Sequence, residues 1–562
     1  MPPVNSPSEP PAEMPAEMPA WHSAVALERL GAAGRVVVRA AGKQLAIFLH
    51  AGRVHACNNR CPHEGYPLVE GRLEAAADGA CVLTCQWHNW KFDLATGANR
   101  YGGDALRIYP VKVEAGTVWV DVRDPPAGER AAQALTQLDA AMADFDAPRI
   151  ARELARLGKA GATPEVALVH AVARSHTRLR YGMTHAWAAA EVWLRLRATL
   201  TDETQRLACA AEVFAHIAFD TLREPVIPFN AEVRPWNEAE FEAAVEAQDE
   251  AQAAALLNGA ARRGLSFTEL EPALSRAALA HFNDFGHALI YLVHLRGLVD
   301  RLGPDAQAPL LLGWLRALIF ATREDLLPDF RAYAPALAAW PVAASDPAGA
   351  PAGAVPTARV NAAAFEARSV RATLDAVVAA AAITASLRIH HGLMQAAAHH
   401  LLRFDERVDQ RVDNPVADNV NWLDFTHAIT FGHALRVQCE RLPALWPQAL
   451  LQLAMFVGRN SGYLDAAMPA AAALQRWTVP DAAAFDAHCT ATVLDHGLAL
   501  HILPAHLLKT WAAVRDEIAL GVPEATAQAL RAAVNRLFAA RLKQRHMLRV
   551  AHQALGFVAK ED

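Results

Sequence analysis

The chain has 562 residues, of which 53% are hydrophobic, 20% charged and 7% aromatic, and its net charge is −6. This composition excludes a disordered or fibrous protein, and it offers no basic surface for nucleic acid and no polybasic membrane signal. Seven cysteines are too few for a disulfide scaffold, and the N-terminus lacks the pattern of a secretory signal, so we expect a cytoplasmic protein. We expect no transmembrane helix, because the uncharged apolar runs are shorter than the roughly 18 residues that span a bilayer.

The composition and the residue pattern change along the chain, which predicts a multidomain protein with a β domain followed by an all-α domain. Residues 1–20 repeat PAEM and predict a disordered tail. Short β-type runs such as RVVVRA, LAIFLH and TVWVDV predict a small antiparallel β domain over 21–123. We expect a linker over 124–150 and a large all-helical domain over 151–562, interrupted by a Pro-rich loop at 340–356.

Two short motifs in the β domain carry cysteine and histidine together. Cys61 and His63 form C-x-H, and after 21 intervening residues Cys85 and His88 form C-x-x-H. Two thiolates and two imidazoles are the ligand set of a Rieske [2Fe-2S] cluster, in which cysteines hold one iron and histidines the other. A zinc site would use the same atoms, but its usual spacing keeps cysteine with cysteine and histidine with histidine.

These loops and the FDLATG run after the second motif resemble bacterial Rieske ferredoxins and the Rieske domains of ring-hydroxylating oxygenases over about residues 21–122. The resemblance implies a low-potential electron carrier. Asn89 stands where the family usually has glycine after the second histidine, and asparagine tolerates the left-handed backbone needed there. Cys57 and Cys81 do not occupy the bridging positions of the respiratory class, so we expect buried strand thiols.

Electrons must reach the cluster from outside, because the chain contains neither G-x-G-x-x-G nor a P-loop. We therefore expect an external NAD(P)H-dependent reductase or a ferredoxin as partner. Asp424, His427 and His433 are one residue off the iron-binding spacing of ring-hydroxylating oxygenases, but their surroundings read as helix, so the α+β catalytic domain of those enzymes is not expected.

Nineteen of the 24 histidines fall in the helical part. The run that begins at Asp284 and contains His287 is echoed by the run that begins at Asp424 and contains His427, which indicates two equivalent helices presenting the same side chains to one site. His287 and His294 are seven residues apart and therefore share a helix face. Several facing helices that each donate an inward ligand are how helical bundles build metal sites.

The helical part resembles, over about 160–520, the questin oxidase-like family, whose members oxidatively open rings of anthraquinone-type polyketides at a His-rich non-haem iron site. The resemblance rests on YGMTHAW, GHALI with the following HLR, FTHAIT and HLLK. Family members usually lack a fused Rieske domain. Matching segment by segment, the resemblance implies metal ligation by His185, His287, His294, His427, His506 and Lys509.

Lys509 lies three residues after His506 and therefore on the same helix face. An ammonium cannot bind a cation, so Lys509 must be neutral or carry CO2 as a carbamate if it joins the metal site. Alternatively, Lys509 is a solvent-facing lysine that extends its head group from the helix. We expect His427 and Lys509 to be catalytic.

The sequence thus predicts an iron-dependent monooxygenase or dioxygenase in which a Rieske cluster feeds a non-haem iron that activates O2. We expect a small apolar aromatic or polyketide-like substrate. A diiron carboxylate centre, with Glu191 and Glu212 as bridging ligands, and a non-catalytic electron-transfer or redox protein with a helical docking domain remain open alternatives. A folded-back Rieske domain or a neighbouring subunit of a homo-oligomer could bring the cluster to the iron. The aromatic residues expected around the substrate are Trp187, Trp193, Phe285, Tyr291 and Phe425.

Overall fold

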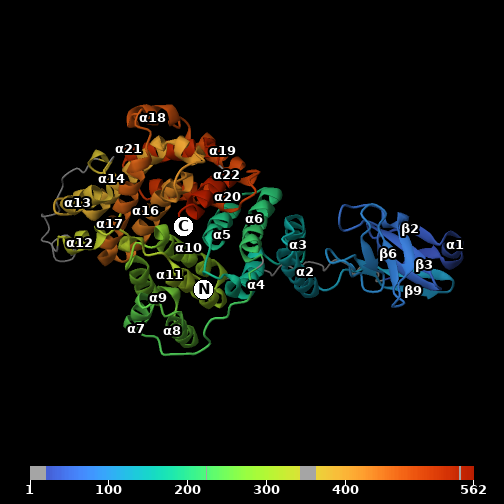
Figure 1. The fold of residues 1–562 in the computed structure, drawn as a ribbon. Coiled ribbons are helices and arrows are strands. Elements are labelled where there is room, and N and C mark those ends of the chain that lie inside the picture. The colour runs from blue at the N-terminus through green and yellow to red at the C-terminus, as the bar shows by residue number, and fades with distance from the viewer. Residues whose placement is uncertain (1–20, 223, 342–361, 367, 543–545, 562) are drawn as a thin grey trace, which may run out of the picture. The chain divides into compact units, whose positions relative to one another are not determined.

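The protein is described by a computed structural model that covers residues 21–222, 224–341, 362–366, 368–542 and 546–561 (Figure 1). The expected tail at 1–20 and most of the expected loop at 340–356 lie outside the described residues. The chain divides into two compact units, Met1–Ala141 and Met142–Asp562, which are described separately.

The first unit is a small antiparallel β domain, which confirms the predicted fold class. Its strands form three sheets with the orders β1-β10-β9, β2-β3-β4-β8 and β5-β6-β7, and every pairing between them is antiparallel. The strands are β1 (Trp21–Ala26), β2 (Arg35–Ala40), β3 (Lys43–His50), β4 (Arg53–Asn58), β5 (Arg72–Ala75), β6 (Cys81–Thr84), β7 (Lys91–Asp93), β8 (Ile108–Tyr109), β9 (Val111–Glu114) and β10 (Thr117–Asp121). The short helix α1 (Leu27–Ala33) follows β1.

An apolar core beneath the ends of β4 and β6 supports the two loops that follow these strands. Phe48, Leu68, Leu83 and Phe92 are fully buried in it. Alternate residues of an extended strand face opposite sides, so the short alternating runs of the sequence place these side chains inward. The loops that carry the predicted cluster ligands therefore start from a packed base.

Helix begins within the segment expected as a linker. The helix α2 (Ala127–Ala143) occupies most of 124–150 and crosses the boundary between the units, and α3 (Ala147–Lys159) starts soon after it. Asp146 caps α3 by accepting a hydrogen bond from the Arg149 backbone N–H.

The second unit is all-helical, as predicted (Figure 1). Its helices after α3 are α4 (Pro164–Ser175), α5 (His185–Thr199), α6 (Glu203–Thr221), α7 (Glu238–Glu246), α8 (Glu250–Arg263), α9 (Phe267–Leu279), α10 (His287–Leu302), α11 (Gln307–Phe320), α12 (Tyr333–Ala338), α13 (Val370–Ala381), α14 (Ser386–Arg403), α15 (Glu406–Gln410), α16 (Trp422–Arg441), α17 (Trp446–Asn460), α18 (Ala470–Trp477), α19 (Ala482–Leu494), α20 (Ile502–Ala519), α21 (Glu524–Ala539) and α22 (Met547–Val558). Four of them form a closed ring, in which α5 packs on α10 and α20, and α16 packs on the same two helices. The side chains on the inner faces of α5, α10, α16 and α20 can therefore meet at one point.

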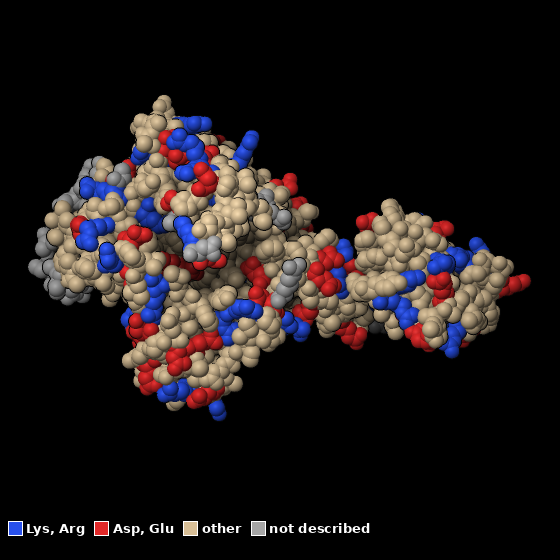
Figure 2. All heavy atoms as spheres, viewed as in Figure 1, with Lys and Arg blue, Asp and Glu red and all other residues tan. Residues whose placement is uncertain are grey.

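Within the described residues, no helix combines the length and the apolarity that crossing a bilayer requires. On the face drawn in Figure 2, acidic and basic side chains are interspersed, and neither sign dominates a large area. This agrees with the small net charge of the chain.

Candidate metal centres

The two Cys/His loops of the first unit, 61–66 and 85–90, share the same backbone hydrogen bonds and the same left-handed position. In the first, the Cys61 N–H donates to the Tyr66 carbonyl oxygen at 2.9 Å, and the Gly65 N–H donates to the Cys61 carbonyl oxygen at 2.8 Å. The Cys85 and Asn89 N–H groups repeat both bonds in the second loop, to Trp90 and Cys85 respectively. The fifth residue of each loop is left-handed, with φ of 79° at Gly65 and 59° at Asn89. The conformation expected for Asn89 is confirmed.

The loops bring the two predicted pairs of ligands together. Cys61 and Cys85 are buried, and their thiols interact with each other. The rings of His63 and His88 lie 4.8 Å apart at the outer end, and the Trp90 indole stacks on His63 at 4.4 Å. Buried sulfur atoms with half-exposed imidazoles above them form the donor set of a cluster with an outward-facing iron.

The other two cysteines of the first unit lie on strands. Cys57 is fully buried on β4, and burial raises the pKa of its thiol to about 12. Cys81 is half-buried at the start of β6, and burial also raises its pKa. Both thiols therefore remain protonated and act as small apolar side chains.

In the second unit, four imidazoles converge from the four helices of the ring. His185 and His287 are the first residues of α5 and α10, whereas His427 and His506 lie in the second turns of α16 and α20. The Nε2 atom of His287 lies 3.0 Å from that of His185 and 2.9 Å from that of His427, and the His427 Nε2 lies 3.3 Å from the His506 Nε2. His185, His427 and His506 offer ligand nitrogens that all lie within 4.8 Å of one another.

Outer hydrogen bonds orient two of these rings. The His506 Nδ1 donates to the Ile502 carbonyl oxygen at 2.8 Å, and a carbonyl can only accept, so the Nε2 of the neutral ring is a lone pair. The His287 Nδ1 donates to the Asp284 carboxylate at 3.1 Å, which directs the Nε2 of this ring inward. The Nε2 atoms of both rings face the His427 Nε2. A cation at this point would satisfy them together.

The electrostatics of the centre favour neutral imidazoles. Burial, followed by the positive charge of Lys509, holds the pKa of His185 and of His506 well below the ordinary value. Burial and the neighbouring imidazoles do the same to the pKa of His427. Lys509 itself is only 2% exposed, and burial lowers its pKa to about 7.

A strained turn sets the position of His287. The three residues before it, Asp284, Phe285 and Gly286, all have positive φ angles, of 39°, 49° and 73°. A Cβ atom on Gly286 would come within 2.4 Å of the Phe431 ring, so only glycine fits there. Left-handed non-glycine residues cost on the order of 1–3 kcal/mol each and concentrate at functional sites.

A buried carboxyl holds the same turn. Glu324 accepts a hydrogen bond from the Phe285 backbone N–H, while its Oε2 atom is buried without a hydrogen-bond partner among the described residues. Burial, and then the charge of Asp284, raise the pKa of Glu324 to about 8. Glu324 is therefore mostly protonated at neutral pH.

The Rieske [2Fe-2S] domain model matches residues 20–109 of the chain. The ferredoxin component of a naphthalene 1,2-dioxygenase system from Pseudomonas aeruginosa is 30% identical over 104 residues, which are 18% of this chain and 95% of that protein. The chain belongs to the Rieske family. A 4β-methylsterol monooxygenase from Methylococcus capsulatus is 36% identical over 100 residues, and a human Rieske domain-containing protein is 33% identical over 100 residues. These matches cover 16% and 15% of this chain, and only 26% and 63% of the length of those relatives.

The Rieske domain implies a [2Fe-2S] cluster. These similarities lie within the Rieske domain.

His294, one of the predicted ligands, is not brought to the point where the four imidazoles meet. Its Nδ1 lies 3.0 Å from a Glu191 oxygen, deeper along α10. His433 is paired in the same way with Glu517, at 2.9 Å. These two pairs form a second layer of buried histidine and carboxylate in the four-helix ring.

The carboxylates considered for a diiron centre are engaged elsewhere. Glu191 accepts from His294, and Glu212 is bonded to His496 at 3.0 Å and to His501 at 3.2 Å. Asp424 forms an ion pair with Arg459 at 3.0 Å. The group of metal-ligating atoms found among the described residues contains no carboxylate.

Of the aromatic residues expected around a substrate, two lie at the centre. The Tyr291 ring stacks on His287 at 5.2 Å, and its hydroxyl lies 3.3 Å from the His185 Nδ1. The Phe285 ring lies 6.2 Å from that of His427. The other three belong to the packed core: Trp187, Trp193 and Phe425 are at most 2% exposed.

Two polar residues of α6, His216 and Asp220, were not predicted. Asp220 accepts a hydrogen bond from the Thr184 hydroxyl and one from the Ala186 N–H, which flank His185. His216 stacks on His501 at 5.6 Å, and burial is the largest cause lowering its pKa to about 3. Glu212, His216 and Asp220 are four residues apart and share one helix face, and this spacing was the available signal.

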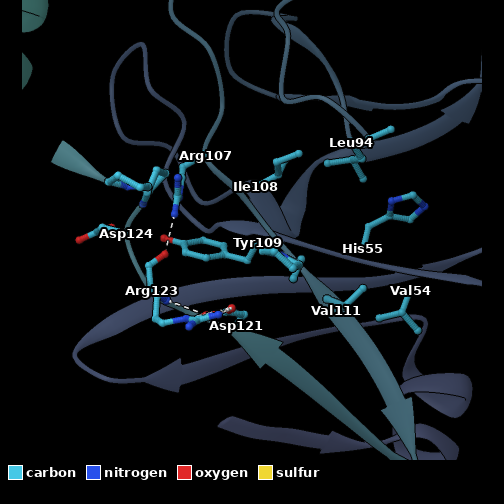
Figure 3. Close-up of a pocket in the computed structure, with 15 residues that line it drawn as sticks. Val54, His55, Leu94, Arg107, Ile108, Tyr109, Val111, Asp121, Arg123 and Asp124 are labelled. Atoms are coloured by element: carbon cyan, nitrogen blue, oxygen red, sulfur yellow. Dashed lines mark hydrogen bonds and ion pairs between the residues drawn. The ribbon is translucent and has the colours of Figure 1, made fainter. Parts of the chain in front are cut away.

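The Rieske domain also contains a groove of about 820 Å³, lined by β4, β8 and the segment after β10 (Figure 3). The Tyr109 ring lies in it, with Arg107 5.1 Å from the ring centre. Arg123 pairs with Asp121 at 2.6 Å on the wall. No cysteine or histidine of the two Cys/His loops lines this groove.

Proposed function

We propose that the protein is an iron-dependent oxygenase, in which the Rieske cluster passes single electrons to a non-haem iron held in the helical unit. In this proposal Cys61 and Cys85 hold the inner iron of the cluster, and His63 and His88 hold the outer one. The observation that carries the proposal is the convergence of four Nε2 atoms, one from each helix of a closed ring.

The donor set fits an iron ion. Imidazole–metal bonds of about 2.0–2.1 Å place neighbouring ligand atoms about 2.8–3.4 Å apart, and the separations here are 2.9, 3.0 and 3.3 Å. Neutral imidazoles with outward Nδ1–H groups need no deprotonation before they bind a metal. We assign His185, His287, His427 and His506 as the ligands, with Asp284 orienting His287 from outside.

Lys509 would complete the ligand set as a carbamate. Four neutral imidazoles leave the charge of a divalent ion unbalanced, and a lysine that has taken up CO2 supplies one negative oxygen ligand. The burial of Lys509 and its pKa of about 7 support this, because a neutral amine is the form that reacts with CO2.

When bound, the iron would supply O2 activation, and the electrons would come one at a time from the cluster. The chain's own residues exclude water by burying the imidazoles, and they hold the Tyr291 hydroxyl, whose pKa burial keeps well above its ordinary value, as a neutral hydrogen-bonding group beside His185. Phe285 and Tyr291 give the centre an aromatic wall, which suits a small apolar aromatic or polyketide-like substrate. An external NAD(P)H-dependent reductase or ferredoxin would reduce the cluster.

The test is product formation under ¹⁸O2 with the full chain, a reducing system for the cluster and a hydroxyanthraquinone as the probe substrate. We expect ¹⁸O in the product from the wild type and none from His427→Ala, with equal cluster reduction in both. Label incorporation by His427→Ala would refute the assignment of the site. If iron-loaded wild-type protein reduced by the cluster consumes O2 but oxidises no aromatic probe, the substrate class is wrong.

A further inference from the structure

The C-terminal helix α22 (Met547–Val558) turns its polar side toward the protein. Arg549 is 5% exposed, and its guanidinium donates to the Arg411 carbonyl oxygen at 2.7 Å. The Gln553 amide donates to the Asn414 carbonyl oxygen at 3.0 Å. Polar side chains of α22 therefore attach the helix to the backbone of the segment at the end of α15 and after it.

The apolar side of α22 faces outward. An amphipathic surface helix normally buries its apolar stripe and exposes its polar one, and α22 does the reverse. Successive helical residues are 100° apart, which gathers these side chains on one half of the helix. Those that are more than half exposed are Met547 (70%), Leu548 (59%), Val550 (53%), Leu555 (72%), Phe557 (59%) and Val558 (60%).

We propose that this face, formed by the six exposed apolar side chains of α22, is the contact surface between two copies of the chain. At the exposures observed, it offers roughly 500–600 Å² per copy and so about 1,000–1,200 Å² for a pair, which reaches the lower limit of specific interfaces. The area per copy lies at the upper end of the range for the largest apolar patch of a typical monomer, about 300–600 Å².

The chemistry of the face favours a second copy over a membrane. An uncharged apolar face can pack against an identical face without charge repulsion. In a dimer with a two-fold axis, α22 of one copy can lie opposite α22 of the other. A helix lying on a membrane needs lysine and arginine on its polar side, free to reach the head groups. On α22 the arginine of that side, Arg549, is buried against backbone carbonyls instead.

The test is sedimentation of the full chain from sub-micromolar to tens of micromolar concentration. We expect a species of twice the 60.6 kDa chain mass, and Leu555→Glu or Phe557→Glu should weaken its formation by at least about 100-fold, because each buries an unpaired carboxylate. The matched control is Val166→Glu, on a side chain that is 49% exposed on α4, and it should leave the dimer intact. A wild-type monomer at every concentration, or a dimer that both α22 variants retain, would overturn the proposal.

A second measurement does not depend on any variant. Backbone hydrogen exchange over 547–558 in the wild type should slow as the concentration rises, while exchange over α4 stays constant. Equal exchange at all concentrations would contradict the proposal. Flotation of the wild type with vesicles of anionic and neutral phospholipid, lost in Leu555→Glu, would assign the face to a membrane and would also contradict it.

Discussion

The two candidate metal centres of this chain are built in opposite ways. The Rieske domain takes its four predicted ligands from two loops within residues 61–88, and each loop is closed by its own pair of backbone hydrogen bonds. The helical unit takes its four imidazoles from helices that begin as early as 185 and as late as 502. Only the packing of α5, α10, α16 and α20 brings these side chains together.

Because of this difference, substitutions elsewhere in the chain should affect the two centres unequally. A loop held by local hydrogen bonds keeps its geometry when the rest of the chain changes, whereas a centre shared by four helices depends on each of them and on the groups behind the ligands. The two centres should therefore respond independently to substitution.

The largest effect is expected in the Rieske loops. His63→Ala or His88→Ala removes a predicted ligand of the outer iron, so the brown colour and the rhombic EPR signal of the reduced cluster should be lost or strongly altered. The control His55→Ala, which lies on β4 outside both loops, should keep the signal. A colourless wild-type preparation with one zinc per chain would contradict the cluster assignment.

Substitution in the helical centre should leave the cluster untouched. His427→Ala should lose one iron per chain and all substrate oxidation, with an unchanged Rieske EPR spectrum. The matched variant His294→Ala removes a buried histidine from the same unit, but its partner is Glu191, so iron should be retained. Full iron content in His427→Ala, or iron loss from His294→Ala, would show that the ligand set is assigned wrongly.

Two substitutions of Lys509 distinguish a role in binding the metal from a role in packing. Lys509→Arg should abolish oxidation because a guanidinium neither loses its proton nor takes up CO2, whereas Lys509→Glu should keep most of the iron. Iron analysis and turnover of both variants provide the measurement. Wild-type activity in Lys509→Arg would rule out the ligand role.

The smallest effect concerns the turn before His287. The pKa of Glu324 is about 8 in the folded protein and 4.5 ordinarily, so the folded state binds more protons between these values, and the free energy of unfolding falls as pH rises from about 4.5 to about 8. Glu324→Gln should remove this contribution and raise the unfolding temperature of the helical unit at pH 8 by about 5 °C.

The unfolding temperatures of the wild type and of Glu324→Gln, measured from about pH 4.5 to about pH 8, test this prediction. The control Glu203→Gln changes a side chain that is 89% exposed and should leave the pH dependence as it is. An unchanged slope in Glu324→Gln would mean that Glu324 titrates normally.

Local signals in the sequence were sufficient for much of this structure. The alternating runs predicted the antiparallel domain, and the left-handed Asn89 followed from the loop motif. Four histidines named from separate segments do meet at one point, although their ligand role remains a prediction. His294 does not meet them, because seven residues advance about 10 Å along a helix. Two side chains on the same helix face can therefore lie too far apart to reach one metal ion.

The two Asp-x-x-His runs are similar in sequence but adopt different local structures. Gly286 allows a left-handed turn, so Asp284 folds back onto His287, whereas the matching Thr426 continues a helix and Asp424 pairs with Arg459 instead. The deciding residues lie on other elements, Phe431 against Gly286 and Arg459 against Asp424. Their positions depend on tertiary packing, which single-sequence spacing does not encode.

We infer that this chain carries a [2Fe-2S] cluster and one further iron. Iron and acid-labile sulfide, counted per chain in the full-length protein after anaerobic loading with ferrous iron, test it most directly. We expect three irons and two sulfides, with the third iron absent from His427→Ala. Two irons and two sulfides would leave the helical unit without iron, and four irons would indicate a diiron centre; either result would contradict a mononuclear iron site in this unit.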